Sequence, residues 1–416
     1  MSKGGRTRAF RFETYCIGLL CWAGVGGAPV LAGQYDFGLG YSLTHNSNIT
    51  RGSAPPGCLN PPCAELTQQL FGGFGYEEHG PALNARLVAQ AERRHFARNV
   101  YQDDTGFFLD GAAVWTISPR QFTWSVEDSF REVPLDFRAP DTPANRAKVN
   151  SLSTGPEFTF RLNPANDSVI GVRYGQYHVR DPGNNPDALG DNERYTTYLR
   201  WLFRISTPTV LSLNFETTRA HFDPRPPPAA QFTSLSREDL FFRYELVLTY
   251  NRQTVDVGTT RLAQDGGQEQ NRRLVRYFGQ LSPTSQSALR VSLYDQMSDT
   301  YSDMIRSVTS LTIPTIPATQ VDAAAFAAAS NVAAGDIYRI QGGDLVYLTQ
   351  GNLLDFSLQG YVRRIDYVNV PQDYQEKGGR FSATWSFSIG AQAYAFTQYM
   401  RRSFSSFDEE DAERNR

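Results

Sequence analysis

Five histidines are the first residues to weigh for catalysis, because imidazole exchanges protons near neutral pH. They are His45, His79, His95, His178 and His221. Serine and asparagine lie near several of them, but the sequence marks no nucleophile with its base, no glycine-rich phosphate loop and no metal-ligand spacing. The sequence therefore predicts no catalytic residues and no enzyme.

Four cysteines allow either a disulfide or a metal site. Cys16 and Cys21 lie in an apolar N-terminal segment, whereas Cys58 and Cys63 lie in a run rich in proline. Two cysteines five positions apart in an exported chain most simply form a disulfide within a loop. A metal site would need further ligands, and the neighbouring sequence offers none. We therefore predict a Cys58–Cys63 disulfide, no metal and no cofactor.

Arginines stand out among the charged residues, because many occupy alternate positions in segments that are apolar at every second residue. We predict that they face water, since a charged side chain on a lipid face costs about 2–4 kcal/mol at the bilayer midplane. These arginines are Arg86, Arg161, Arg173, Arg200, Arg204, Arg243, Arg276, Arg290, Arg363 and Arg380. The acids at equivalent positions are Glu92, Glu127, Glu157, Glu216, Glu245 and Asp355.

Two interpretations of these charges stay open. They could form cross-strand ion pairs that only solvate an interior, because opposite charges on neighbouring strands pair routinely. Taken together, ten arginines against six acids would instead favour anionic or neutral polar solutes.

The segments that carry these side chains alternate with a period of two, which is the period of a β-strand with one apolar and one polar face. Most span 12–16 residues, and a strand crossing a bilayer needs about 9–11. The predicted strands are 34–45, 65–79, 82–97, 104–117, 121–132, 150–163, 168–180, 192–206, 209–222, 237–251, 253–264, 268–282, 286–300, 337–349, 352–365, 374–389 and 391–404.

Short turns alternate with long polar connections between these strands, as in outer-membrane β-barrels. The alternative fold, a soluble β-sandwich, would have shorter strands and no such alternation. The longest connection, 301–336, contains an alanine-rich run, and alanine is the best helix former. We predict a short helix over 319–330, either on the surface or as a constriction or lid.

Composition agrees with one all-β, transmembrane, antiparallel up-and-down barrel. Mean hydropathy is −0.42, which excludes a bundle of membrane helices, and aromatic residues make up 13% of the chain, as aromatic girdles require. The formal net charge of −3 does not suggest a nucleic-acid partner. The expected partners are therefore outer-membrane lipid and small polar solutes or polysaccharide.

The N-terminus has the order of a secretory signal peptide. A basic region ends at Arg11, an apolar region spans 15–25, and small residues precede a cleavage point near Ala32 or Gly33. A membrane helix is the alternative, but the apolar run is too short and Pro29 and several glycines interrupt it. We predict a signal peptide over 1–32 and a barrel over 33–416.

The first predicted strand and its loop resemble a known family. The segment 38–51, with the sequence GLGYSLTHNSNITR, resembles the start of the β-barrel porin 2 type outer-membrane proteins, which include members associated with exosortase and exopolysaccharide systems. In that family an acidic residue or Asn is followed by Asn, an aliphatic residue and Arg. Here Ser47 stands at the acidic position, and Asn48, Ile49 and Arg51 match. The resemblance implies an outer-membrane, porin-like protein.

Seventeen strands is an odd number, whereas bacterial single-chain barrels have an even number and both chain ends on the periplasmic side. The final residues, 408–416, resemble the acidic and arginine-rich stretches that open earlier returning strands. The sequence therefore predicts an eighteenth strand missing beyond Arg416. It also predicts a gap or a parallel seam between 34–45 and 391–404.

Two functions follow from these expectations. The first is a pore for small polar, anionic or sugar-derived solutes. The second is a structural or accessory barrel in exopolysaccharide export or surface assembly, with a plugged lumen. An outer-membrane enzyme, such as a lipase with a Ser and His pair, is a third and less supported interpretation.

Overall fold

The computed structural model describes residues 10–22, 33–46, 49, 63–134, 145–180, 191–223, 234–265, 269–299, 301–302, 337–368, 373–388 and 391–404. These residues form eighteen strands of one antiparallel sheet. The strands are β1 (Phe10–Trp22), β2 (Gln34–Asn46), β3 (Glu65–His79), β4 (Leu83–Phe96), β5 (Asp104–Ser118), β6 (Phe122–Pro134), β7 (Arg146–Asn163), β8 (Asn166–Arg180), β9 (Asn192–Ser206), β10 (Thr209–Phe222), β11 (Ser234–Val247), β12 (Asn251–Gln264), β13 (Gln270–Thr284), β14 (Ser287–Ser298), β15 (Tyr338–Thr349), β16 (Leu354–Tyr367), β17 (Tyr374–Ser388) and β18 (Ala391–Phe404).

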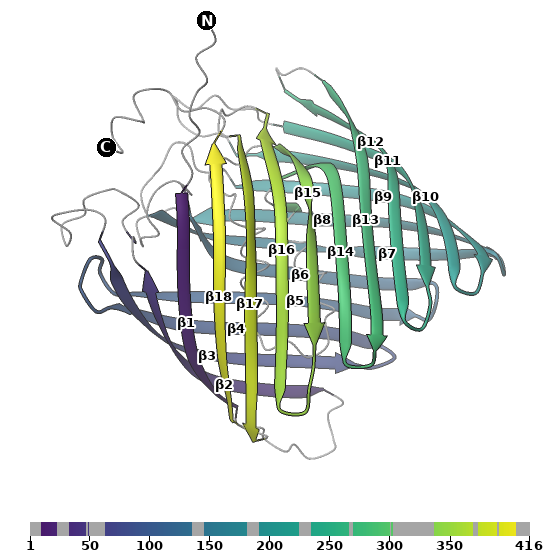
Figure 1. Cartoon of the computed structure of the whole chain (residues 1–416). Coiled ribbons are helices and arrows are strands. Elements are labelled where there is room, and N and C mark those ends of the chain that lie inside the picture. The colour runs from purple at the N-terminus through teal and green to yellow at the C-terminus, as the bar shows by residue number, and fades with distance from the viewer. Residues whose placement is uncertain are drawn as a thin grey trace, which may run out of the picture.

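Each strand is hydrogen-bonded to its predecessor and its successor in the chain. β1 pairs with β2 on one side and with β18 on the other, so the pairings form a ring (Figure 1). A ring of strands leaves no unpaired sheet edge, which is the condition for a sheet to cross a bilayer. The predicted fold class, an antiparallel up-and-down β-barrel, is confirmed.

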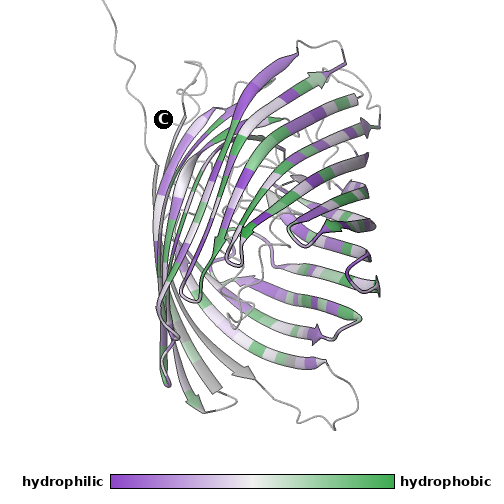
Figure 2. Cartoon of the chain, turned by 90° about the vertical axis from the view of Figure 1, so that its right-hand side faces the viewer, coloured by the Kyte–Doolittle hydropathy of each residue, from purple (hydrophilic) through white to green (hydrophobic). Residues whose placement is uncertain are grey.

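Hydrophilic and hydrophobic residues alternate along many of the strands (Figure 2), so the two faces of such a strand differ in chemistry. On β9, Tyr195, Leu199 and Trp201 are exposed, whereas Arg194 and Tyr198, at positions of the other parity, are buried. Large apolar side chains are exposed on each of the other strands from β2 to β18 as well, for example Leu39 on β2 and Trp385 on β17. A protein whose outer face is apolar and whose inner face is charged matches lipid outside and water inside.

The strands β2–β18 agree closely with the seventeen predicted ones, and β1 is the difference. Residues 10–22, within the predicted signal peptide, lie between β2 and β18 and pair antiparallel with both. The predicted gap or parallel seam at this place is therefore wrong for this structure. β1 was not predicted from the sequence because residues 10–22 have the basic-then-apolar order of a signal peptide, and residues 15–22 are apolar without alternation. The signal peptide itself stays a prediction.

Several strand ends also differ from the prediction. β7 begins at Arg146 rather than at 150, and the hairpin after β11 turns at 248–250 rather than at 251–252. In that hairpin the Leu248 N–H donates to the Asn251 carbonyl at 2.7 Å. The alternation of apolar residues runs on through the turn, so it could not mark where the strand ended. The predicted helix over 319–330 lies outside the described residues.

Among the described residues, no helix has the length and apolarity needed to cross a membrane.

Candidate functional site: a charged pocket in the barrel interior

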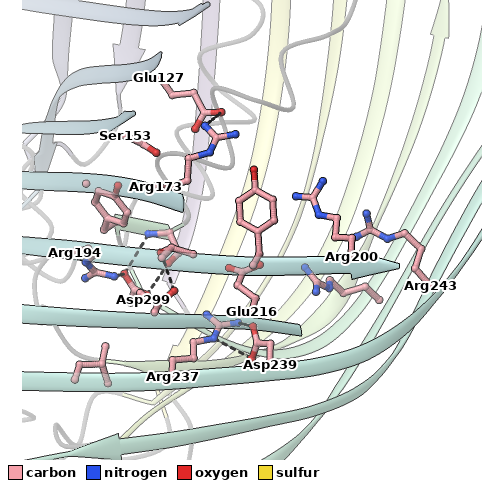
Figure 3. Close-up of a pocket in the computed structure, with 18 residues that line it drawn as sticks. Glu127, Ser153, Arg173, Arg194, Arg200, Glu216, Arg237, Asp239, Arg243 and Asp299 are labelled. Atoms are coloured by element: carbon pink, nitrogen blue, oxygen red, sulfur yellow. Dashed lines mark hydrogen bonds and ion pairs between the residues drawn. The ribbon is translucent and has the colours of Figure 1, made fainter. Parts of the chain in front are cut away.

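A pocket of about 380 Å³ lies inside the barrel against strands β6–β13 (Figure 3). Six arginines and four acids line it together with hydroxyl side chains. The arginines are Arg173, Arg194, Arg200, Arg237, Arg243 and Arg276, and the acids are Glu127, Glu216, Asp239 and Asp299. The pocket is therefore built from charged groups that face an interior rather than from an apolar ligand cavity.

The period of two in each strand places these side chains in the interior. Arg194, Tyr198 and Arg200 are separated by even numbers of residues on β9, so they share one face. Charged residues on neighbouring strands also stand opposite one another. Arg243 on β11 is opposite Asp256 on β12, and Asp256 is opposite Arg276 on β13. A continuous row of charge follows across three strands.

That row contains two arginines and one shared carboxylate. The Nε of Arg243 lies 2.7 Å from Oδ1 of Asp256, and the Nε of Arg276 lies 3.2 Å from Oδ2 of the same residue. Asp256 is almost fully buried, whereas both arginines are partly exposed. One negative charge held between two positive ones leaves a net positive patch on this wall.

Other arginines of the pocket have an acid each, at different distances. Arg237 lies 2.7 Å from Asp239, and Arg173 lies 3.6 Å from Glu127. Arg200 is more distant from its acid, because its Nη1 lies 3.9 Å from Oε2 of Glu157. The same Oε2 atom also accepts a hydrogen bond from the Tyr198 hydroxyl. A guanidinium so loosely paired keeps donors available for a polar solute.

The residues that follow β14 reach across the interior to the opposite wall. Asp299 forms an ion pair of 2.7 Å with Arg194 on β9, and the Tyr301 hydroxyl donates to the Leu152 carbonyl on β7 at 3.1 Å. The Arg194 guanidinium also lies 4.5 Å from the centre of the Tyr301 ring. The base of the longest connection is thus fixed inside the barrel.

An apolar cluster lies around the Arg194–Asp299 ion pair and Tyr301. It is found toward the strand ends that carry the long connections. Its inward-facing members on β7–β12 include Val149, Tyr177, Phe222 and Leu262. Met297 and Ile337, which flank the longest connection, complete it from β14 and from the start of β15. Because these side chains are buried against one another, this part of the lumen is filled by protein.

The structure brings together six of the predicted inward-facing residues and places Glu157 beside them. The six are Arg173, Arg200, Arg243, Arg276, Glu127 and Glu216. The others lie elsewhere along the wall. Arg161 pairs with Asp167 at 3.3 Å, Arg290 donates to Gln280 at 3.1 Å, Glu245 pairs with Arg252 at 3.1 Å, Arg86 acts electrostatically on Asp110, and Asp355 accepts from the Gly351 N–H at 2.9 Å.

Sequence reasoning missed Arg194, Arg237, Asp239 and Asp299. Arg194 could have been found, because it shares the parity of Arg200 on the same predicted strand. Arg237 lay at the start of a predicted strand, where the direction of a side chain, inward or outward, cannot be assigned from alternation. No local signal pointed to Asp299, because its partner is 105 residues away.

The predicted disulfide can be followed at one of its two cysteines. Cys63 is disulfide-bonded, and its carbonyl accepts a hydrogen bond from the Ile49 N–H at 3.0 Å. Cys58 lies outside the described residues, so the pairing stays a prediction. Among the described residues, no group of three His, Cys, Asp or Glu side chains could hold a metal ion.

No protein-family model and no curated protein match the sequence, so the likeness to porin 2 type proteins remains a resemblance. Among solved structures, the chain is similar to the FrpB iron transporter from Neisseria meningitidis (F5-1 variant), with 8% identity, a TM-score of 0.43, and coverage of 94% of this chain and 82% of that one.

Two further solved structures are similar over nearly their whole length. Pseudomonas aeruginosa OccK2 (OpdF) has 10% identity and a TM-score of 0.36, with 95% of this chain and 96% of that chain covered. A bacterial polysaccharide outer membrane secretin has 11% identity and a TM-score of 0.28, with 95% and 98% covered. At these scores nothing about their cargo is transferred to this chain.

The assignment to a membrane rests on the chain's own construction. Its ring of antiparallel strands, apolar outer face and charged interior are what a β-barrel needs to cross lipid. The protein has the fold of an outer-membrane β-barrel, and that fold places it in the bacterial outer membrane.

Proposed function

We propose that this chain forms a pore of the outer membrane for small polar solutes that are anionic or sugar-derived, and that it acts as a channel rather than as an enzyme. The observation that supports the proposal is the interior row of Arg243, Asp256 and Arg276 beside the loosely paired Arg200. Guanidinium groups offer several donors in a fixed plane, which suits carboxylate, phosphate and sugar hydroxyl groups.

A planar bilayer tests the proposal. The purified, refolded protein should give stepwise conductance in potassium chloride, and a uronic acid salt added to one side should reduce that conductance in proportion to its concentration. Ethylene glycol added to the same viscosity, which carries neither a charge nor a sugar ring, controls for viscosity. A barrel that is folded yet electrically silent would contradict the pore.

A second function has its own observation. Asp299 and Tyr301 fix the base of the longest connection across the interior, and the apolar cluster around them fills part of the lumen. An accessory barrel in exopolysaccharide export or surface assembly would need such a plugged lumen and would act through its outer loops. Silence in the bilayer, together with a polysaccharide export defect in a deletion strain, would support this function over the pore.

A further inference from the structure

The outer face of the barrel has a groove of about 950 Å³ over strands β14–β18. Gly360 on β16 stands directly opposite Gly379 on β17. Both glycines lie on the outward face of their strands, because the residues two positions away, Leu358, Val362 and Phe381, are exposed. A Cβ built on Gly360 would meet no atom within 4 Å. Exposed Leu345, Leu358 and Phe381 border this floor of backbone. The groove is thus an apolar depression that faces lipid.

Two positive charges stand directly beside the groove. Lys377 on β17 is opposite Arg401 on β18, one outward position beyond the pair of Gly379 and Tyr399. They lie toward the strand ends that carry the long connections, which are the extracellular ends in barrels of this kind. Like charges directly opposite each other destabilise a strand pair, so an anion near them would be stabilising.

The neighbouring outer-face charges are compensated by the chain itself. Arg339 and Arg273 both pair with Asp295, Arg364 pairs with Asp366, and Arg261 pairs with Glu269. Neither Lys377 nor Arg401 forms an ion pair with any described residue. Lys377 lines this groove and Arg401 stands opposite it, so two charges without an ion-pair partner among the described residues lie directly at the apolar groove.

We propose that this groove binds one phosphorylated glycolipid of the outer leaflet, of the lipid A type. An acyl chain lies on Gly360 and Gly379, and a phosphate group lies between Lys377 and Arg401. The extracellular position of the two cations selects the outer leaflet, and the combination of phosphate with a saturated chain matches cations placed directly above an apolar floor.

Native mass spectrometry of the full-length protein in detergent tests the site with purified lipid A as the probe. Each basic residue near a lipid headgroup contributes about 1 kcal/mol, so Lys377→Ala and Arg401→Ala should each weaken binding about fivefold and the double variant about 30-fold. Lipid A without phosphate should bind the native protein as weakly as the double variant does. Lys377→Arg, which keeps the positive charge, should bind lipid A as tightly as the native protein does.

The apolar part of the site has its own variant. Gly360→Leu should fill the groove without a clash, because the space above Gly360 is open, and should abolish binding while leaving the barrel folded. Gly72→Leu, at a glycine of a second outer groove, and Arg261→Ala are the matched controls, and both should bind lipid A normally. A heat-modifiable band in electrophoresis checks folding of every variant.

Three results would overturn the proposal. The first is unchanged lipid A affinity in the folded double variant Lys377→Ala/Arg401→Ala. The second is unchanged affinity in folded Gly360→Leu. The third is equal competition by phosphatidylglycerol, which would show a site for any anionic lipid rather than for a phosphorylated glycolipid.

Discussion

Arg194 and Asp299 form an ion pair of 2.7 Å that joins β9 to the residue directly after β14, and both side chains are almost fully buried. Burial alone would raise the pKa of Asp299, but the Arg194 guanidinium and the hydrogen bonds from Ser302 lower it below its ordinary value. The carboxylate is therefore charged at neutral pH and holds the base of the longest connection inside the barrel.

Replacement of Asp299 by Asn should loosen this connection. Removing one partner of a buried ion pair costs about 3–5 kcal/mol because the other charge stays buried and unpaired. We expect a larger and noisier single-channel conductance in a planar bilayer. The control is Asp366→Asn, which removes an exposed pair with Arg364 on the outer face and should leave conductance unchanged. Equal conductance in Asp299→Asn and the native protein would contradict a role of this pair in narrowing the lumen.

Arg243 and Arg276 should set charge selectivity. Arg243→Gln leaves Asp256 paired with Arg276, so the fold should tolerate the change while the patch loses its net charge. A unit charge about 4 Å from an ion in bulk water contributes about 1 kcal/mol, so the chloride-to-potassium permeability ratio should fall roughly fivefold. Asp256→Asn should raise that ratio. Reversal potentials in a salt gradient measure both, and an unchanged ratio would place the ion path elsewhere.

Acid should break the contacts of Asp103, which precedes β5, with His95 and Phe96 at the end of β4. The pKa of Asp103 is lowered, first by its hydrogen bond with His95 and then by the Phe96 N–H that it accepts. A lowered pKa in the folded state means that the stabilisation is present above the ordinary aspartate pKa and is lost as pH falls through the lowered value. The NMR amide signal of Phe96 should therefore titrate below the ordinary aspartate range. The variant Asp103→Asn should abolish that titration. A titration midpoint at or above the ordinary aspartate pKa would contradict the stabilising contacts of Asp103.

The disulfide at Cys63 should be closed with Cys58. Alkylation without reduction should leave Cys63 unmodified in the native protein, and Cys58→Ser should make it reactive. Closing so short a loop restricts the unfolded chain by about 2 kcal/mol, which is the upper limit of the stability that the variant should lose. A Cys63 thiol that stays blocked in Cys58→Ser would show a different partner.

Cleavage of the signal peptide should be visible in protein taken from the outer membrane. We expect an N-terminus near Gly33, determined by N-terminal sequencing, because the segment 1–32 has the order of a cleaved signal. Such cleavage would remove residues 10–22 from their place between β2 and β18. An intact N-terminus, with 10–22 protected from protease, would instead establish β1 as a permanent strand of the wall.

The sequence by itself determined seventeen of the eighteen strands, β2–β18, and which face of each of them meets water. Alternation of apolar and polar residues is a local property, and a strand turns its side chains to opposite faces with the same period. The parity of Arg243 against Phe242, or of Arg200 against Trp201, was therefore enough to separate interior from lipid. It was not enough at strand ends, where the hairpin at 248–250 continues the alternation without continuing the strand.

Only the tertiary structure decided which of the inward charges meet. Strand order brings Arg243, Asp256 and Arg276 side by side, but the contact of Arg194 with Asp299 joins residues 105 positions apart, and that of Tyr301 with Leu152 joins residues 149 apart. Such contacts depend on the curvature of the closed wall and on where a connection enters the lumen. No local pattern of residues encodes either of these, because both are properties of the whole ring of strands.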